Sequence, residues 1–134
     1  MKIVQSSGKR KRAIARATLK TEGNGITRIN GVPIQKIQPQ LARMKVKELL
    51  IIVKHDKLDE VDININVQGG GVTGQMDAAQ IALSRVIVKY LNDKAITERI
   101  KEYDRSMLSG DSRQVERKKW GGRKARARFQ KSFR

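Results

Sequence analysis

The residues best suited to chemistry in this sequence are the cations of its last two dozen positions. From Ser112 onward the chain carries ten Lys or Arg and a single acid, Glu116. Three aromatic residues, Trp120, Phe129 and Phe133, are spaced among the cations. Guanidinium and ammonium groups bind phosphates, and aromatic rings stack on bases and riboses. The pattern therefore predicts contact with a nucleic acid, because a merely solubilising tail needs far less charge.

The same stretch is predicted to be extended or disordered until it meets a polyanion. It has little apolar material, and Gly121-Gly122 interrupts it, so burial cannot offset the entropy lost on ordering. Fully extended, the residues from Ser112 onward span at most about 75 Å. We accordingly predict a globular body at residues 1–104 and an extended basic tail at residues 105–134.

The charge of the chain is concentrated at its two ends. The net charge is +7 over residues 1–20, +1 over residues 21–111 and +9 over residues 112–134. The first cluster, Gly8-Lys9-Arg10-Lys11-Arg12, comes directly before a strand pattern and is interpreted as a fixed phosphate clamp, with a surface patch or nuclear-import tag as the alternative. A nearly neutral body thus has two cationic ends, which are the candidate binding surfaces.

A glycine-rich stretch, Gly69 to Gly74, matches the pattern G-x-G-x-x-G. A dinucleotide site also needs a second parallel strand that ends at an acid, and the region around Asp93 predicts a helix instead. The P-loop form is missing as well, because no Lys-Ser or Lys-Thr follows Gly74. We interpret the stretch as a strand-to-helix turn whose backbone N–H groups can seat a phosphate of a nucleic-acid backbone.

Catalytic and metal-binding patterns are missing from the sequence. His55 is the only histidine, and the absence of cysteine excludes disulfides, thiol catalysis and common zinc clusters. The acids that follow it, Asp56, Asp59, Glu60 and Asp62, lack the spacing of a calcium loop. We therefore expect no catalytic residue, metal, cofactor or small-molecule substrate.

The sequence also gives no indication of a membrane segment. Its longest apolar run, Leu49 to Val53, is five residues long, whereas a membrane helix needs about 20. The residues after Met1 do not resemble a signal peptide. A cytoplasmic protein without a membrane partner is expected.

Hydrophobic periodicity predicts two strands near the N-terminus. Residues 13–20 alternate, with small apolar side chains on one face, and Asn24-Gly25 predicts a hairpin to a second strand at residues 26–30. On this hairpin Arg16, Lys20 and Arg28 are predicted to form a basic stripe.

The remaining elements are three helices and one further strand. Residues 39–53 are predicted as a helix with Leu41, Met44, Leu49 and Ile52 facing the core. Residues 61–68 alternate strictly, which is typical of a strand with its Val and Ile toward the core. Helices are predicted at residues 75–92, with Arg85 and Lys89 on the outer face, and at residues 93–103. The fold class is therefore α+β: a small, mostly antiparallel sheet with helices on one face and a basic tail.

Three motifs in order resemble the small-subunit ribosomal protein S-nine family, in its archaeal and eukaryotic form. Residues 8–17 are similar to the family's opening, G-x-R-K-x-A-x-A-R-A, and residues 69–75 to its glycine turn. Residues 111–134 resemble its tail, which is the most specific of the three motifs.

The resemblance implies a left-handed βαβ body, like the second domain of ribosomal protein S-five, on rRNA in the head of the small subunit. It also implies that the tail threads through rRNA toward the anticodon stem-loop of P-site tRNA. Carried over by position, the tRNA contacts are Lys131 and Arg134. The predicted rRNA contacts, from the first cluster and the tail, are Lys9, Arg10, Lys11, Arg12, Arg16, Arg113, Arg117, Lys118, Lys119, Arg123, Lys124, Arg126 and Arg128.

The sequence thus predicts a non-enzymatic structural constituent of the small ribosomal subunit. Its expected partners are small-subunit rRNA, P-site tRNA and neighbouring proteins of the subunit head. The alternative is a DNA-packing architectural protein, which shares the charge but should present a dimer surface or a groove-reading helix.

Overall fold

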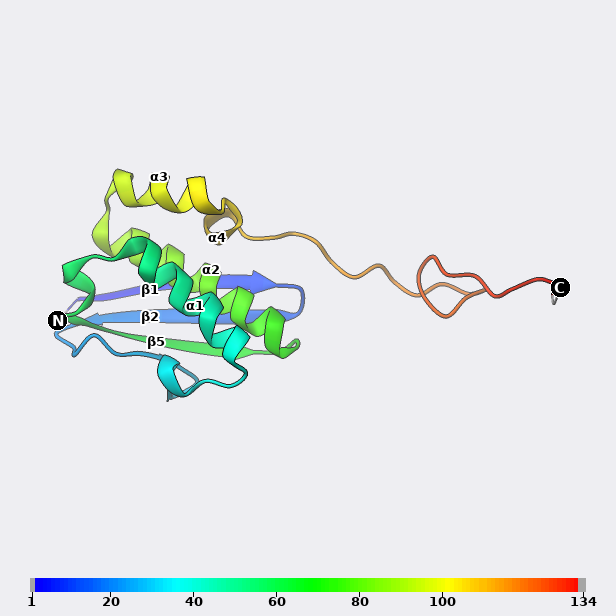
Figure 1. Ribbon diagram of the computed structural model, residues 1–134, viewed down its shortest axis with the longest axis horizontal. Coiled ribbons are helices and arrows are strands. Elements are labelled where there is room, and N and C mark those ends of the chain that lie inside the picture. Colours follow the sequence, from blue (N-terminus) through cyan, green and yellow to red (C-terminus); the bar gives the residue numbers. More distant parts are fainter. Residues whose placement is uncertain (1, 133–134) are drawn as a thin grey trace.

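The computed structural model describes residues 2–132, which form an α+β body followed by a projecting tail (Figure 1). The strands are β1 (Ile3–Arg10), β2 (Ala13–Thr21), β3 (Thr27–Ile29), β4 (Val32–Pro33) and β5 (Val61–Gln68). The helices are α1 (Gln40–Val53), α2 (Val72–Leu91), α3 (Lys94–Tyr103) and α4 (Ser106–Ser109), with short 3-10 helices η1 (Ile34–Lys36) and η2 (Asp56–Leu58).

The strands form one sheet in the order β1-β2-β5-β3-β4. All neighbours are antiparallel except β3 and β5, which run parallel and are joined through α1. Helix α2 packs across β1, β2 and β5, α1 packs on α2, and α3 packs on α1. The predicted fold class, a mostly antiparallel sheet with helices on one face, is confirmed.

The core forms where the alternating faces of two central strands meet α2. In β2 the buried side chains are Ala13, Ala15, Ala17 and Leu19, and in β5 they are the Val and Ile residues that the sequence predicted. The small side chains let α2 approach the sheet closely. At Gly8 of β1 the approach is closest, since an added Cβ would lie 2.4 Å from the carbonyl oxygen of Ala78.

The predicted hairpin between residues 13–20 and 26–30 is wrong. Strand β2 pairs with β1 on one side and β5 on the other, and β3 lies beyond β5. The Asn24-Gly25 turn is held by the carboxylate of Asp62, which accepts hydrogen bonds from the backbone N–H groups of Asn24 (2.9 Å) and Ile26 (3.1 Å). The chain therefore passes the start of β5 and continues on its far side.

The hairpin that does form joins β1 and β2 through Lys11 and Arg12. Arg10 and Ala13 are its last paired residues, and Lys11 adopts a positive φ of 52°. The basic cluster at residues 9–12 was predicted to precede one strand. In the structure its first two residues end β1, and its last two form the turn into β2.

The face predicted for α1 is only partly right. Leu49 is fully buried, but Leu41 is 76% exposed and Met44 is 50% exposed. The buried residues are instead Ala42, Val46, Leu49 and Val53. This set has the same helical period as the predicted one, and periodicity alone did not identify which stripe faces the core.

Candidate nucleic-acid interface

The β1–β2 turn, the glycine turn and the start of the tail lie at the same end of the body (Figure 1). A Cβ on Gly69 would lie 2.7 Å from the carbonyl oxygen of Arg12, and one on Gly70 would lie 3.0 Å from the backbone nitrogen of Ala13. Both glycines have positive φ, +76° and +67°. Gly69 and Gly70 are therefore explained by close backbone packing against the basic turn.

Four of the five cations predicted for the first cluster are exposed. The side chains of Lys9, Lys11, Arg12 and Arg16 have no hydrogen-bond or ion-pair partner within residues 2–132. Because neither packing nor pairing occupies them, these groups are free to bind phosphates. They lie in the turn and in the adjoining parts of β1 and β2.

Arg10 is placed differently, because protein groups surround its guanidinium. Its side chain is 15% exposed, its Nη2 lies 3.3 Å from a carboxylate oxygen of Asp111, and its Nε lies 3.8 Å from Asp77. Its Nη1 also donates to the carbonyl oxygen of Arg113 at 3.3 Å. Arg10 thus connects β1 to the tail, and its predicted contact with rRNA stays a prediction.

Asp111 fixes the first residues of the tail. Its carboxylate accepts hydrogen bonds from the backbone N–H of Arg113 (2.9 Å) and from the guanidinium of the same residue (2.7–3.1 Å). The guanidinium contact, followed by the backbone N–H and then Arg10, holds the pKa of Asp111 well below its usual range. The group is therefore a carboxylate at any physiological pH.

Arg85 makes a second connection, which sequence reasoning missed. Its Nε and Nη2 donate to the carbonyl oxygens of Leu108 (2.8 Å) and Ser109 (2.9 Å), at the end of α4. Its Nη1 donates to the carbonyl oxygen of Ser7 in β1 at 2.8 Å. The prediction that Arg85 points away from the body is therefore wrong. No local signal reveals this, because the three acceptors are backbone groups of distant segments.

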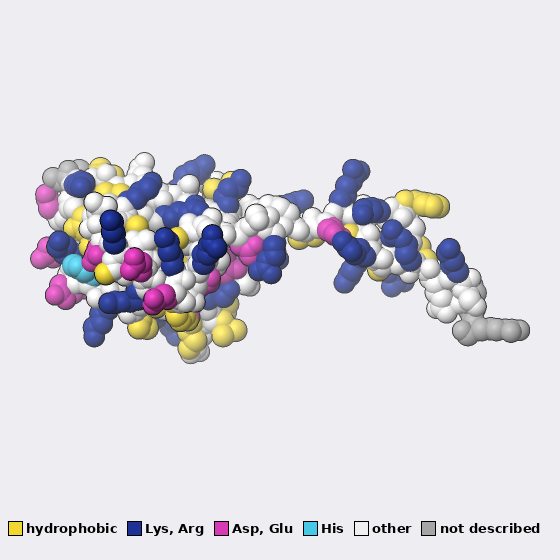
Figure 2. Space-filling view, turned by 90° about the horizontal axis from the view of Figure 1, so that it is seen from above, with side chains coloured by type: hydrophobic (Ala, Val, Ile, Leu, Met, Phe, Trp, Pro, Cys, Tyr) yellow, Lys and Arg dark blue, Asp and Glu magenta, His cyan; other side chains and the backbone are white. Residues whose placement is uncertain are grey.

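Beyond Asp111 the described part of the tail contains no helix or strand. On the face that Figure 2 shows, several Lys and Arg side chains project from the tail, whereas on the body they mix with acidic groups. Trp120 is 99% exposed, and Phe129 is also exposed, so both rings are free to stack. The exposed cations on this segment are Arg113, Arg117, Lys118, Lys119, Arg123, Lys124, Arg126, Arg128 and Lys131.

The tail makes one loop of its own. Arg126 binds Glu116 with two hydrogen bonds of 2.8 and 2.9 Å, and the N–H of Phe129 donates to the carbonyl oxygen of Gly121 at 3.1 Å. The guanidinium of Arg126 lowers the pKa of Glu116.

Nine of the ten predicted tail cations lie in the described part of the chain. The tenth, Arg134, lies outside it, as does Phe133.

Other chemistry is not indicated in the described part of the chain. His55 accepts a hydrogen bond from the N–H of Lys57 at 3.1 Å and so caps η2. No cluster of three His, Cys, Asp or Glu in residues 2–132 could hold a metal ion. A separate search of the same residues finds no helix with the length and apolar character to span a membrane.

Comparison with known proteins gives one consistent family. The family model of ribosomal protein S9/S16 matches residues 8–134. Small ribosomal subunit protein uS9 of Methanothrix thermoacetophila is 52% identical over 134 residues, which is all of both chains. The uS9 protein of Desulfurococcus amylolyticus is 51% identical over all of this chain and 94% of its own. That of Halobacterium salinarum is 46% identical over 98% of this chain and 99% of its own.

Proposed function

Since this chain belongs to the ribosomal protein S9/S16 family, we propose that it binds rRNA in the head of the small ribosomal subunit and extends its tail to the P-site tRNA. The family predicted from the sequence is confirmed. The protein is a structural constituent of the small subunit in the cytoplasmic ribosome and is not an enzyme. Family membership also argues against the DNA-packing alternative.

The observation that carries the rRNA proposal is the run of exposed cations along the described part of the tail. The tail exposes its cations along an unstructured segment, and no packed core competes for them. Arginine suits such a segment because its planar group binds phosphate with two hydrogen bonds and also stacks on bases. Lys9, Lys11, Arg12 and Arg16 extend this surface onto the body.

In this proposal residues 1–104 form the body that docks on rRNA and residues 105–134 form the extension. Helix α4 lies in the extension but packs on α2, with Met107 buried. Together with Arg85 and Asp111, this contact fixes where the tail leaves the body. The projecting part therefore begins near Asp111, and the anticodon stem-loop would be approached by Lys131 and Arg134.

Deletion of residues 130–134 tests the tRNA contact. We expect the shortened protein to fold and to assemble into small subunits, because the described residues among those deleted, 130–132, are exposed and lie outside the core. P-site tRNA should bind these subunits several-fold more weakly, and the slope of log affinity against log salt should fall by about 1–2, since two cations are removed.

A matched control removes two cations from the body instead. The variant Lys94→Gln/Lys101→Gln alters exposed positions of α3 and should leave tRNA affinity unchanged. Filter binding of tRNA to reconstituted subunits over a salt series measures both variants. Equal tRNA affinity for the deletion variant and the native protein at every salt concentration would contradict the proposed contact.

A further inference from the structure

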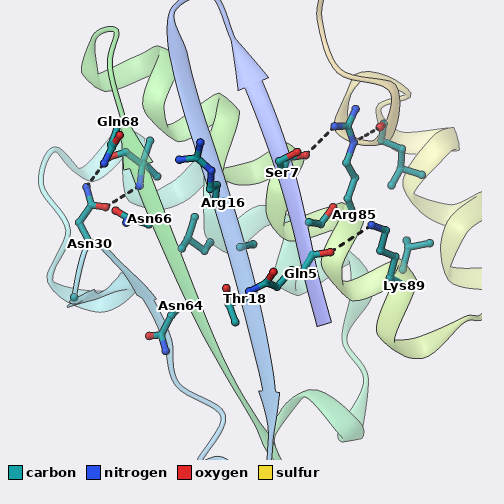
Figure 3. A pocket seen from close by; sticks show the side chains of 17 residues that line it. Gln5, Ser7, Arg16, Thr18, Asn30, Asn64, Asn66, Gln68, Arg85 and Lys89 are labelled. Atoms are coloured by element: carbon teal, nitrogen blue, oxygen red, sulfur yellow. Dashed lines mark hydrogen bonds between the residues drawn. The ribbon is translucent and has the colours of Figure 1, made fainter. Parts of the chain in front are cut away.

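The face of the sheet that α2 does not cover presents rows of side chains that can form hydrogen bonds (Figure 3). The strand register places Ser7, Arg16 and Asn66 side by side in one row. The next row contains Gln5, Thr18 and Asn64, and Arg28 of β3 extends it. Four neighbouring strands, β1, β2, β5 and β3, thus contribute to a continuous polar surface, which we call the open face.

Five polar side chains of the open face are not used by the protein itself. Within the described residues, the side chains of Gln5, Ser7, Arg16, Asn64 and Asn66 have no hydrogen-bond partner, and all are exposed. An amide side chain offers both a donor and an acceptor, which is the combination that base edges and ribose hydroxyls require. Lys and Glu, which are mostly exposed in proteins, are missing from these two rows.

A groove of about 1390 Å³ lies over this face. Pockets for small molecules are usually about 300–1000 Å³, so the groove suits a longer ligand that lies across the strands. Arg85 and Lys89 of α2 close its β1 side by donating to the carbonyl oxygens of Ser7 (2.8 Å) and Gln5 (3.3 Å). These contacts occupy the edge of β1, which disfavours the addition of a further strand from a protein partner.

The charges on the open face favour a polyanion. Besides Arg16 and Arg28, the register places Lys9 and Lys20 on it, against one acid, Asp62. The carboxylate of Asp62 is already bound by two backbone N–H groups and lies 3.8 Å from Arg28. A protein interface needs an apolar centre. On β1 and β2 the apolar residues of this face are Ile3 and Ile14, which the register places near opposite ends of the two strands rather than in the middle.

We propose that the open face binds an unpaired segment of RNA, with Asn64, Asn66 and Gln5 contacting base edges or ribose hydroxyls and Arg16 contacting phosphate. The proposal rests on the proposed function, in that the RNA is small-subunit rRNA. It adds a site on the body where recognition depends on neutral amides as well as on charge. An unpaired segment is favoured over a duplex because its bases can turn toward the amide rows, whereas a duplex offers side chains little beyond the ribose hydroxyls and base edges of its shallow minor groove.

Photo-crosslinking in assembled subunits tests this site. A benzophenone amino acid replaces Asn64 on the open face, Lys124 in the tail or Gln40 at the exposed start of α1, each in the full-length protein. We expect crosslinks to rRNA from positions 64 and 124 and a lower yield from position 40. A crosslink from position 64 to a protein, or none at all while position 124 reacts, overturns the proposal. No crosslink from position 124 contradicts the proposed tail contact, so the two failures are distinguishable.

An affinity measurement keeps the proposal testable should the bulky probe disturb the face. Asn64→Thr/Asn66→Thr removes both amides without changing charge and keeps residues that favour strands. We expect this variant to bind small-subunit rRNA about fivefold or more weakly with an unchanged salt slope, because hydrogen bonds but no phosphate contacts are lost. Gln38→Thr/Gln40→Thr is the matched control. Equal affinities for the two variants would overturn the proposal.

Discussion

At the scale of single residues, Asp62 shows how one carboxylate determines the path of the chain. It stands at the start of β5 and accepts hydrogen bonds from the N–H groups of Asn24 and Ile26. The N–H of Asn24 contributes most to lowering the pKa of Asp62, followed by that of Ile26. The carboxylate thus accepts the backbone hydrogen bonds of residues 24–26 that a hairpin would otherwise satisfy.

The lowered pKa of Asp62 predicts a pH dependence of stability. A carboxylate whose pKa is lower in the folded state stabilises the fold above its unfolded pKa, near 3.9, and this contribution is lost as pH falls through the folded pKa. Asp62→Asn should therefore unfold at lower denaturant concentration than the native protein at pH 5–7, and the difference should shrink below about pH 4. Denaturant unfolding at several pH values measures it.

Glu102→Gln, at an exposed position of α3, is the control for a simple loss of one negative charge. The control should show little difference from the native protein at any of these pH values. If the effect of Asp62→Asn were the same at pH 3 as at pH 7, the charge on Asp62 would not be what holds the turn.

At the scale of elements, the contact between β1 and α2 depends on the absence of a side chain at Gly8. An added Cβ would lie 2.4 Å from the carbonyl oxygen of Ala78 and 2.6 Å from the nitrogen of Ala82, both backbone atoms. We expect Gly8→Ala to lower the free energy of unfolding by about 1–3 kcal/mol, because strand and helix must separate. Thermal or denaturant unfolding measures this.

Gly74→Ala gives a comparison with the opposite expected sign. Gly74 lies in the first turn of α2, and an added Cβ would make only ordinary contacts of 3.7 and 3.9 Å. Alanine favours a helix over glycine by up to about 1 kcal/mol, so stability should stay equal or rise. Comparable losses for the two variants would contradict the close contact at Gly8.

The elements also show which parts of the fold can be predicted from sequence. Strand β5 was predicted with its bounds and its buried face, because its alternation is strict. Strand β1 was missed, because Ser6 and Gly8 stand where apolar residues would mark its inner face. The β2–β3 hairpin was wrong because a turn signal is local, whereas the competing hydrogen bonds come from Asp62, 38 residues from Asn24.

The candidate interface, like the fold, could be predicted from the sequence only in part. The cationic ends are visible in the sequence because charge is a property of each residue. The roles of Arg10 and Arg85 are not visible there, because both bind carbonyl oxygens more than 20 positions away. Of the residues on the open face, only Arg16, Lys20 and Arg28 were predicted from the sequence to share a surface. The amide rows of this face depend on the pairing of β1, β2 and β5, which no local pattern specifies.

At the scale of the whole molecule, the formal net charge of +17 is divided between the tail and the body. Residues 112–134 carry +9, and the body carries +8, of which +7 lies in residues 1–20 with β1 and most of β2. The body has enough apolar residues for one core, and the tail has too few to form another. The two parts are joined through α4, Arg10, Arg85 and Asp111. A folded body therefore positions the start of a cationic segment that projects from it.

The salt dependence of binding to small-subunit rRNA tests this account most directly. The comparison is between the full-length protein and a full-length variant with six tail cations replaced by Gln: Arg117, Lys118, Lys119, Arg123, Lys124 and Arg128. Each phosphate contact contributes about 0.7–0.9 to the slope of log affinity against log salt, so the variant's slope should be smaller by roughly 4–5. Equal slopes for the two proteins would contradict the claim that the tail binds rRNA through its cations.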